Sequence, residues 1–600
     1  MKLSDYIFDT LAMHGVRHVF SVPGGAAMHL NDSAGRRSDM EFISNIHEQC
    51  SAIAAEAYAK VTEGLGVCLV TAGPGGTNAI TGLTGAWLDS TPCVFLSGQV
   101  KTADLKADSG VRQFGNQEID IVTIVSSITK YAVTITDPDT VRYHLEKALY
   151  LASSGRKGPV WLDIPLDVQA ASIDPDALPG FRPEPASPSN TNLHAVVSRT
   201  LDLLSRSERP LLLGGNGIRC AGAVEAFREL VDLLGIPVTT TWLAVDLIHD
   251  SHALFSGRPG GMAPRGANFT LQNSDFLLSI GARLDMATVG YSHERFASGA
   301  SKVIVDLDEA EIRKLKMPID EPVVADAGEF IAELLRQARA RRQPERRAWI
   351  DQVHAWREHY PLSAPQAKEG KTGISTYDFS AILSDESPQG ALLVPGSSGF
   401  ASEIYYLMLK VKTGQRCFHN RGTGSMGFAI PSALGACIAG QGQLTISVDG
   451  DGGFLFNIQE LATIARLNLP IKFFVVNNQG YASIRASQTG YFGGRLVGCD
   501  ATSGLCLPDV TEVAKAFGIA SSSIGPQDDM RQVIREALAA PGPVVCDVHV
   551  MPDEPREPRL VSTRLDDGSI VSSPLEDLFP FLDRDEFARN MIGAMAAEID

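Results

Sequence analysis

The segment from Val448 to Ile484 carries the residue types that bind a hard metal ion. Two aspartates flanked by glycine, Asp449 and Asp451, are followed by the adjacent asparagines Asn477 and Asn478, the second of them 27 positions after Asp451. Carboxylate and amide oxygens favour Mg²⁺, which takes its remaining ligands from water and phosphate groups. These residue types therefore predict a magnesium ion that carries a diphosphate.

Two parallel strands are expected to position these side chains. Leu444–Val448 and Ile471–Val476 are apolar runs typical of buried strands, and Asn457–Leu467 between them has helical periodicity. Parallel strands joined in this way end at the same edge of a sheet, where the ligands of such sheets bind. Asp449–Gly453 is expected to form a turn there, with three glycines that let backbone N–H groups approach phosphate, namely Gly450, Gly452 and Gly453.

A glycine turn of a dinucleotide-binding fold is the alternative interpretation. The pattern Gly450-x-Gly452-x-x-Leu455 lacks the third glycine of that fingerprint, and the second strand ends in asparagine instead of a ribose-binding acid. A purely structural turn would not need the paired asparagines. The metal and diphosphate interpretation is therefore favoured.

Length and periodicity predict three α/β domains and an arm. Six hundred residues exceed what one hydrophobic core accommodates. Short apolar runs alternate with helix-period segments, which predicts a doubly wound parallel sheet in each block. The expected domains are residues 1–171, 190–340 and 374–550, followed by an acidic, proline-containing C-terminal arm, 551–600, in which no strand is expected.

Composition excludes several classes of protein. A net charge of −18 argues against a nucleic-acid partner, and no apolar run reaches the roughly 18 residues of a membrane helix. The N-terminal sequence MKLSDYIFDTLAMHG reads as an amphipathic helix instead of a signal peptide. Nine cysteines at irregular spacings predict reduced core residues of a cytoplasmic protein.

The G-D-G and N-N motifs, 27 positions apart between Asp451 and Asn478, resemble the signature of thiamine-diphosphate (ThDP) enzymes. The resemblance implies that Mg²⁺ binds to Asp451, Asn478 and the backbone carbonyl of Gly480. It also implies that the cofactor is contacted by Gly450, Gly452, Gly453, Asn478, Tyr481 and Ala482.

Glu48 is the candidate catalytic acid. It stands where the strand-like Phe42-Ile43 gives way to a helix of small residues, whose close packing predicts a buried glutamate, although a solvated glutamate at a helix start is the alternative. The segment Ser44–Lys60 resembles the H-E-Q-x-A-x-x-A-E-x-Y-A-R motif of acetolactate synthases. That resemblance implies that Glu48 protonates N1′ of the aminopyrimidine, so that the 4′-nitrogen can take the C2 proton of the thiazolium.

Further segments resemble the same family. Arg421–Ala436 resembles the segment in which Met426 holds the two rings in a V and the Gly424 carbonyl accepts from the 4′-amine, although Met426 by itself is typical of a core methionine. The glycine turns Val22–Ala26 and Ala72–Asn78 also match. The resemblance implies active-site positions at Gly25 and Gln117, a fold of three α/β domains, and a homodimer or homotetramer in which the glutamate of one subunit meets the diphosphate of another.

Three departures from the acetolactate synthase pattern concern the acceptor substrate. The family's second arginine in R-F-D-D-R-V-T-G is Ala287 here, its tryptophan after the metal motif is Ser487, and its lysine in L-P-K-D-V is Leu166. Loss of a charge-assisted contact costs about 1.5–3 kcal/mol. The departures predict that a 2-oxo acid donor, pyruvate, transfers its hydroxyethyl or acetyl unit to a ketone or aldehyde without a carboxylate. A nucleotide-bound keto sugar is one candidate, because the tail resembles the branch of the family that makes branched-chain sugars.

Other functions remain open. A true acetolactate synthase, a simple 2-oxo acid decarboxylase and a flavin-dependent oxidase are alternatives, although the chain lacks the adjacent histidines usual in such decarboxylases. The glyoxylate-condensing branch lacks the activating glutamate, and a catalytically silent regulatory homologue would be expected to lose Glu48 or Asp451. Leu213–Gly217 and Arg283 match the flavin region of acetolactate synthases, so the middle domain is compatible both with FAD and with no cofactor.

Overall fold

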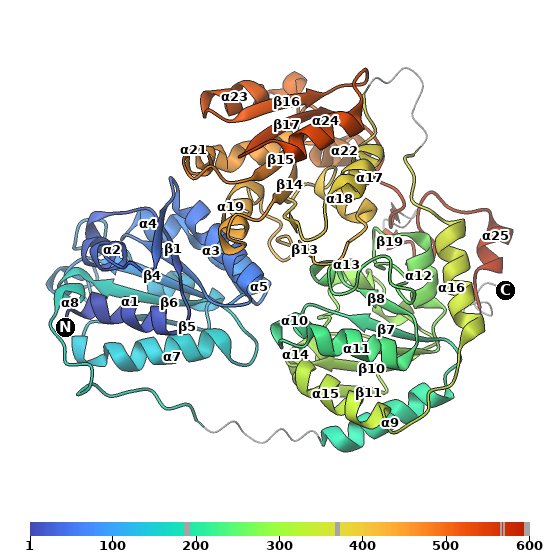
Figure 1. Ribbon diagram of the computed structural model, residues 1–600, viewed down its shortest axis with the longest axis horizontal. Coiled ribbons are helices and arrows are strands. Elements are labelled where there is room, and N and C mark those ends of the chain that lie inside the picture. The colour runs from blue at the N-terminus through green and yellow to red at the C-terminus, as the bar shows by residue number, and fades with distance from the viewer. Residues whose placement is uncertain (185–191, 366–372, 565–566, 568–569, 593–600) are drawn as a thin grey trace.

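Three parallel sheets, each covered by helices, form the body of the molecule (Figure 1). This confirms the predicted fold class. The first domain lies on the left of Figure 1, the third at the top and the second at the lower right. The computed structural model describes residues 1–184, 192–365, 373–564, 567 and 570–592.

The first domain contains a six-stranded sheet in the order β2-β1-β3-β4-β6-β5. Its strands are β1 (His18–Ser21), β2 (Glu41–Ser44), β3 (Gly66–Val70), β4 (Cys93–Gln99), β5 (Tyr131–Thr134) and β6 (Val160–Pro165). Its helices are α1 (Leu3–Met13), α2 (Met28–Gly35), α3 (Glu48–Thr62), α4 (Pro74–Asn78), α5 (Ile80–Leu88), α6 (Ile121–Val125), α7 (Val141–Ser153) and α8 (Leu166–Ala170). Because both faces of the sheet are covered, β3, β4 and β6 are buried along their whole length. The predicted N-terminal amphipathic helix is α1.

The second domain contains a five-stranded sheet in the order β11-β10-β9-β7-β8. Its strands are β7 (Pro210–Gly214), β8 (Val238–Thr240), β9 (Phe276–Ile280), β10 (Ser301–Asp306) and β11 (Glu321–Val324). Its helices are α9 (Leu193–Arg206), α10 (Gly217–Cys220), α11 (Val224–Leu234), α12 (Arg265–Gln272), α13 (Met286–Val289), α14 (Glu309–Arg313), α15 (Ala327–Ala338) and α16 (Arg347–His359).

The third domain contains a six-stranded sheet in the order β13-β12-β14-β15-β17-β16. Its strands are β12 (Leu392–Leu393), β13 (Arg416–Cys417), β14 (Thr445–Gly450), β15 (Ile471–Asn477), β16 (Ala520–Ile524) and β17 (Val544–His549). Its helices are α17 (Thr376–Glu386), α18 (Ser402–Met408), α19 (Ala429–Ala439), α20 (Asp451–Phe454), the 3₁₀ segment η7 (Leu455–Glu460), α21 (Leu461–Arg466), α22 (Ala482–Tyr491), α23 (Val510–Ala516) and α24 (Met530–Ala539).

Two local predictions in the third domain were wrong. Asp449 and Gly450 belong to β14 and Asp451 begins a helix, so Asp449–Gly453 is not a separate turn. The run Asn457–Leu467 is not one helix, because Asn457 has a non-helical backbone (φ −126°, ψ 33°) and the α-helix begins only at Leu461. Asn457 instead donates from its side chain to the Gly427 carbonyl (2.7 Å).

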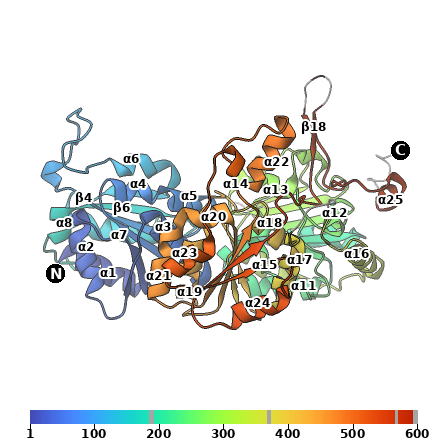
Figure 2. The same ribbon diagram turned by 90° about the horizontal axis from the view of Figure 1, so that it is seen from above.

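The C-terminal arm contains strands, which the sequence prediction excluded. β18 (Ser562–Arg564) and β19 (Ile570–Ser572) form an antiparallel hairpin that projects from the body in Figure 2, and α25 (Arg584–Arg589) follows. The arm docks on the second domain, where Leu560 N donates to Gly261 O and Asn268 Nδ2 donates to Leu575 O, both at 2.7 Å. Of the large apolar residues of the arm, Leu575 and Leu578 are buried, whereas Phe579 and Phe581 are exposed.

All nine cysteines are free, and seven are buried as predicted. The prediction was wrong for Cys506, which is exposed, and Cys220 is only partly buried. Among the described residues, no helix is both long enough and apolar enough to cross a membrane.

Helix α3 of the first domain packs directly on α19 of the third. Small residues permit the close approach: a Cβ on Gly435 would lie 2.1 Å from Ala54 O. The two helices contribute to one hydrophobic cluster, which includes Ala52, Ala54, Ala55, Ile430, Ala433 and Leu434. The first and third domains therefore share a core within one chain.

A buried charge cluster lies beside this helix pair. Lys60 Nζ lies 2.7 Å from Glu56 Oε1 and 2.9 Å from Asp89 Oδ2, and it donates to His419 O (3.2 Å). Asp89 Oδ1 accepts from Gly422 N (3.1 Å). One cation thus faces two buried carboxylates, and burial raises the pKa of Glu56 to about 7. The cluster joins the first domain to the loop of the third domain that continues to Gly424 and Met426.

We predict a pH-dependent contribution of Glu56 to stability. Because its folded pKa is raised from 4.5 to about 7, the stabilisation is present at pH 4.5 and is lost as the pH rises through 7. Glu56→Gln should therefore gain stability relative to the wild type between pH 5 and pH 8, by about 1–3 kcal/mol. Thermal unfolding of both proteins across this range measures the difference. A stability difference between the two proteins that does not change with pH would contradict the raised pKa of Glu56. Glu63→Gln, a substitution at an exposed position, is the control.

Candidate functional site

Asp451 and Asn478 meet at the carboxyl edge of the third sheet. Asp451 is the first residue of α20, with Oδ1 accepting from Gly452 N (2.8 Å) and Oδ2 accepting from Gly480 N (2.9 Å). Asn478 directly follows β15, and its Oδ1 is buried without a hydrogen-bond partner among the described residues. The structure thus brings together the two segments that the sequence pattern paired.

Uncompensated negative charge characterises this edge. Burial raises the pKa of Asp451 to about 6 and that of Asp449 to about 7. The Asp449 Oδ2 atom has no hydrogen-bond partner among the described residues. Buried carboxylates and orphaned carbonyl oxygens are costly unless a cation or a donor satisfies them. The residues present therefore fit a divalent cation.

Two glycines at this edge cannot be replaced without a clash. A Cβ on Gly452 would lie 2.2 Å from Tyr481 Cε1, and one on Gly480 would lie 2.2 Å from Cys499 O. Gly480 also has φ +127°, which other residues rarely adopt. Its carbonyl accepts from Ala482 N (3.0 Å), which leaves one lone pair for a further ligand.

Arg485 of α22 holds the turn that carries Asn478. Its guanidinium donates to Asn478 O (2.9 Å) and to Gln479 O (3.4 Å). Gln479 has φ +62°, so this turn is strained and needs outside support. The side chain of Asn477 donates instead to Asp547 Oδ2 (3.3 Å). The two adjacent asparagines therefore have different roles.

A second wall of the site was missed by the sequence analysis. A cavity of about 190 Å³ lies at the end of β12, next to β14, and Gly424 is among its lining residues. Among its polar lining residues His419 is buried, whereas Ser397 and Ser398 are partly buried. Ser397 Oγ and His419 Nε2 lack partners among the described residues. The signal that could have found them is the Pro-Gly-Ser-Ser-Gly turn after the predicted strand Leu392–Val394.

Gly424, in the loop before α19, lines this cavity, and Met426 follows two residues later in the same loop. Gly424 is exposed with φ +61°, and Met426 is partly buried. The loop is held by Asn457, which donates to Gly427 O (2.7 Å), and by the Lys60 cluster at its start. Met426 is therefore not simply a core methionine.

Glu48 and the two glycine turns of the first domain come together. Glu48 is the first residue of α3, and its Oε2 accepts from Asn78 Nδ2 (2.9 Å). A Cβ on Gly75 would lie 3.7 Å from Glu48 Oε1. The expectation of a buried Glu48 was wrong for the single chain, because its side chain is only partly buried at the start of the helix, while the small residues behind it are fully buried.

Gly25 and Gln117 lie at the surface of this domain. Gly25 begins a 3₁₀ turn after β1 and is exposed. Gln117 is exposed with φ +64°, and its backbone lies against Gly73, where a Cβ would be 2.6 Å from Gln117 O. Both residues are accessible to a ligand or to a second subunit.

Glu460, which the sequence analysis also missed, joins the two half-sites. Its carboxylate is fully buried and accepts from Ile46 N (2.6 Å), His47 N (3.2 Å) and Asn45 Nδ2 (3.0 Å). The third domain thereby fixes the loop that leads into Glu48. Within the described residues, however, no hydrogen bond or ion pair joins Glu48 to Asp451 or Asn478.

The donor set fits Mg²⁺ and a diphosphate. Among the described residues there is no group of three or more His, Cys, Asp and Glu side chains that could hold a metal ion. A site of one carboxylate, one amide oxygen and one backbone carbonyl is instead under-coordinated by protein, as expected for Mg²⁺ that also binds phosphate oxygens.

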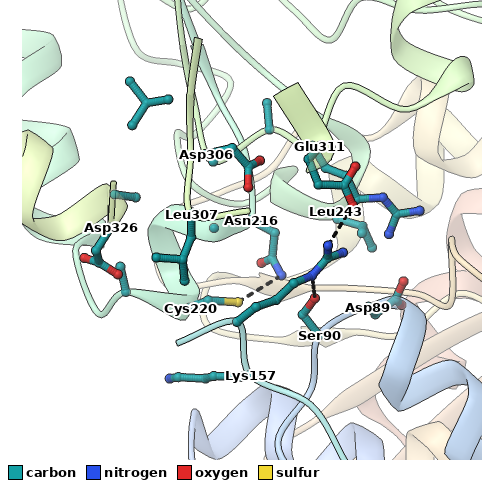
Figure 3. Close-up of a pocket in the computed structure, with 18 of the residues that line it drawn as sticks. Asp89, Ser90, Lys157, Asn216, Cys220, Leu243, Asp306, Leu307, Glu311 and Asp326 are labelled. Carbon is teal, nitrogen blue, oxygen red and sulfur yellow. Dashed lines mark hydrogen bonds and ion pairs between the residues drawn. The ribbon is translucent and has the colours of Figure 1, made fainter. Parts of the chain in front are cut away.

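The cavity at the carboxyl edge of the second sheet does not fit FAD as it stands (Figure 3). Arg283 and the end of the Leu213–Gly217 turn line it, but its volume is only about 120 Å³, whereas cavities for drug-sized ligands measure about 300–1,000 Å³. Arg156 spans it, bonded to Ser90 (3.1 Å) of the first domain and paired at 2.8 Å with Asp308 and Glu311.

The residues that depart from the acetolactate synthase pattern occupy three places. Ser487 is exposed on α22 and lines a groove of about 1,200 Å³ between that helix and the start of the arm. Ala287 lines a small cavity of about 30 Å³ together with Arg283 and Arg421. Leu166 begins α8 of the first domain.

Comparisons with known proteins agree with this architecture. Models of the thiamine pyrophosphate enzyme N-terminal, central and C-terminal domains match residues 1–124, 197–334 and 397–548. The chain is 33% identical to the acetolactate synthase large subunit of Porphyra purpurea over 563 residues, covering 91% of this chain and 92% of the relative. It is also 33% identical to acetolactate synthase 1 of Zea mays over 573 residues, covering 92% of this chain and 86% of the relative. The chain therefore belongs to the acetolactate synthase family of thiamine-diphosphate-dependent enzymes.

Proposed function

We propose that the protein decarboxylates a 2-oxo acid, pyruvate, and transfers the remaining two-carbon unit to a carbonyl acceptor that is not itself a 2-oxo acid. The observation that carries the first half of this proposal is the pair of buried carboxylates at the third sheet edge, opposite the orphaned Asn478 Oδ1. Such an edge needs a cation, and a cation there would hold a diphosphate.

In this proposal Asp451, Asn478 and the Gly480 carbonyl bind Mg²⁺. ThDP, when bound there, would supply a nucleophile for the donor carbonyl and an electron sink for the loss of CO₂. Gly450, Gly452, Gly453, Tyr481 and Ala482 form the backbone cradle, in which nothing larger than hydrogen fits on Gly452. Ser397 and Ser398 extend the cradle from the neighbouring strand end.

Glu48 is the proposed acid that moves a proton at N1′ of the aminopyrimidine. The bond from Asn78 Nδ2 to Glu48 Oε2 (2.9 Å) leaves Oε1 to face the cofactor. Because Glu48 is partly exposed and, among the described residues, has no bond to the metal loops, we propose a homodimer or homotetramer in which a second subunit completes the site. Gly25 and Gln117 would then face the bound substrate.

The acceptor assignment rests on Ser487 and Ala287. Ser487 opens the groove beside the arm, and its volume of about 1,200 Å³ exceeds what a second 2-oxo acid requires. Ala287 carries no charge for an acceptor carboxylate. A ketone or aldehyde, such as a nucleotide-bound keto sugar, suits a wide groove better than a small anion does.

Condensation of two 2-oxo acids is the second candidate. Arg421 lines the same small cavity as Ala287, and its guanidinium carbon lies 4.7 Å from the centre of the Trp242 ring. This cation from the third domain could bind the carboxylate that the second domain no longer binds. The relatives from Porphyra purpurea and Zea mays are named acetolactate synthases, which also favours this candidate.

Asp451→Ala should abolish Mg²⁺-dependent ThDP binding, because it removes the only carboxylate of the proposed metal site. Titration of ThDP against intrinsic fluorescence, with and without Mg²⁺, measures the effect. The exposed Asp528→Ala should bind as the wild type does. Unchanged Mg²⁺-dependent affinity in Asp451→Ala would remove the basis of the metal assignment.

Glu48→Gln should retain ThDP but turn over pyruvate more slowly by a factor of about 10²–10⁴, the usual contribution of general acid–base catalysis. CO₂ release under saturating cofactor measures this. Glu41→Gln, on the exposed side of β2, is the matched control. Wild-type turnover in Glu48→Gln would refute its role.

The double substitution Ser487→Trp and Ala287→Arg should increase acetolactate formation from pyruvate, by about tenfold or more if one charge-assisted contact is regained. Product analysis with pyruvate alone, and with added ketones or aldehydes, measures the change. Ile484→Trp, exposed on the same helix, is the control. If the double variant makes no more acetolactate than the wild type, the acceptor assignment fails.

A further inference from the structure

A cavity between the second and third domains is lined by arginines that the proposed reaction does not use. Its volume is about 590 Å³, within the range of about 300–1,000 Å³ typical of small-molecule sites. Its walls come from α12, α16 and the segment 406–413 that leaves α18. It shares Trp242 and Tyr406 with the cavity at the third sheet edge but is otherwise lined by different residues.

Two guanidinium groups converge in this cavity. The Cζ atoms of Arg258 and Arg357 lie 5.1 and 5.7 Å from the centre of the same ring, Phe255. Asp250 is the only acidic residue among the described residues that line the cavity. Its Oδ2 already accepts from Arg258 and from Val411 N. The carboxylate of Asp250 is therefore already paired.

Arg357 has no carboxylate partner among the described residues. It donates to two backbone carbonyls, those of Phe255 and Asp250, and its desolvation lowers its pKa. Arg258 is 7% exposed, and its Nε is buried without an acceptor. A partly buried guanidinium next to another cation is costly unless an anion compensates it.

Two lysines, Lys410 and Lys412, also line the cavity. Lys412 Nζ donates to the carbonyls of Asp385 (2.6 Å) and Ser387 (2.7 Å). Lys410 is exposed and only 3.8 Å from the Asp385 carboxylate, so it is weakly paired. The lining residues thus include four cations and one acid, which favours an anionic ligand.

We propose that this cavity binds a small organic phosphate, of about the size of a nucleoside monophosphate, with its phosphate between Arg258 and Arg357. Guanidinium groups bind phosphate through paired charge-assisted hydrogen bonds. The volume leaves room for an organic group beyond the phosphate. This inference does not depend on the proposed reaction.

Such a ligand would contact both domains and would influence the loop that carries Gly424 and Met426. Asp250 N donates to Val411 O (3.0 Å), so the cavity wall already joins the second domain to the third. Residues 406–413 continue through β13 to His419, Gly424 and Met426. Ligand binding and ThDP binding would then be thermodynamically coupled, each changing the affinity for the other by the same factor.

Titration calorimetry of the full chain, saturated with ThDP and Mg²⁺, tests the proposal with AMP, inorganic phosphate and adenosine. We expect one AMP per chain, weaker binding of phosphate and none of adenosine. Arg357→Gln should weaken AMP binding by tenfold or more, Arg357→Lys by less, and Arg347→Gln, exposed on the same helix and paired with Asp351, not at all. The melting temperature of each variant checks folding, and Arg357→Lys keeps the test valid should Arg357→Gln unfold.

Two outcomes would overturn the proposal. The first is no saturable binding of either AMP or phosphate at millimolar concentration. The second is AMP binding that survives in Arg357→Gln and Arg357→Lys but is lost in Arg156→Gln, which would place AMP in the cavity of Figure 3 instead.

Discussion

Two carboxylates buried side by side at one sheet edge are the constraint on which the proposed chemistry depends. Asp449 and Asp451 are each less than 5% exposed, and burial raises the pKa of both. No Lys or Arg side chain forms an ion pair with either among the described residues. A protein that keeps such an edge gives up stability. A divalent cation at Asp451 and Asn478 would convert this cost into binding energy for a diphosphate.

The helix pair α3 and α19 transmits this constraint to the first domain. Glu460 binds the loop before Glu48, and Lys60 binds the loop before Gly424, so the two domains hold each other's active loops. Both bonds are partly buried, and each involves a charged side chain that is expensive to leave unpaired. A displacement of one domain relative to the other would therefore break the hydrogen bonds that hold both loops. Rigid placement of catalytic groups requires this kind of support.

The parallel strands and the pairing of Asp451 with Asn478 could be predicted from sequence because apolar runs and strand-end turns are local signals. Glu460 could not, because its role depends on contact with Asn45, more than 400 residues away. The sequence analysis missed the hairpin of the arm because this acidic, proline-containing segment lacks the two-residue apolar alternation typical of a strand. The partial exposure of Glu48 was missed because small residues predict burial of a helix, not of its first side chain.

The residues to which the proposal assigns acceptor specificity lie apart from the buried metal edge. Ser487 faces a groove whose other wall is the start of the arm, and Ala287 faces a loop of another domain. The donor half of the site rests instead on strand ends, which the sheet fixes. Under the proposed function, replacing residues such as Ala287 and Ser487 would change the acceptor without disturbing the buried carboxylates. This separation would let the metal motif stay intact while the acceptor contacts differ.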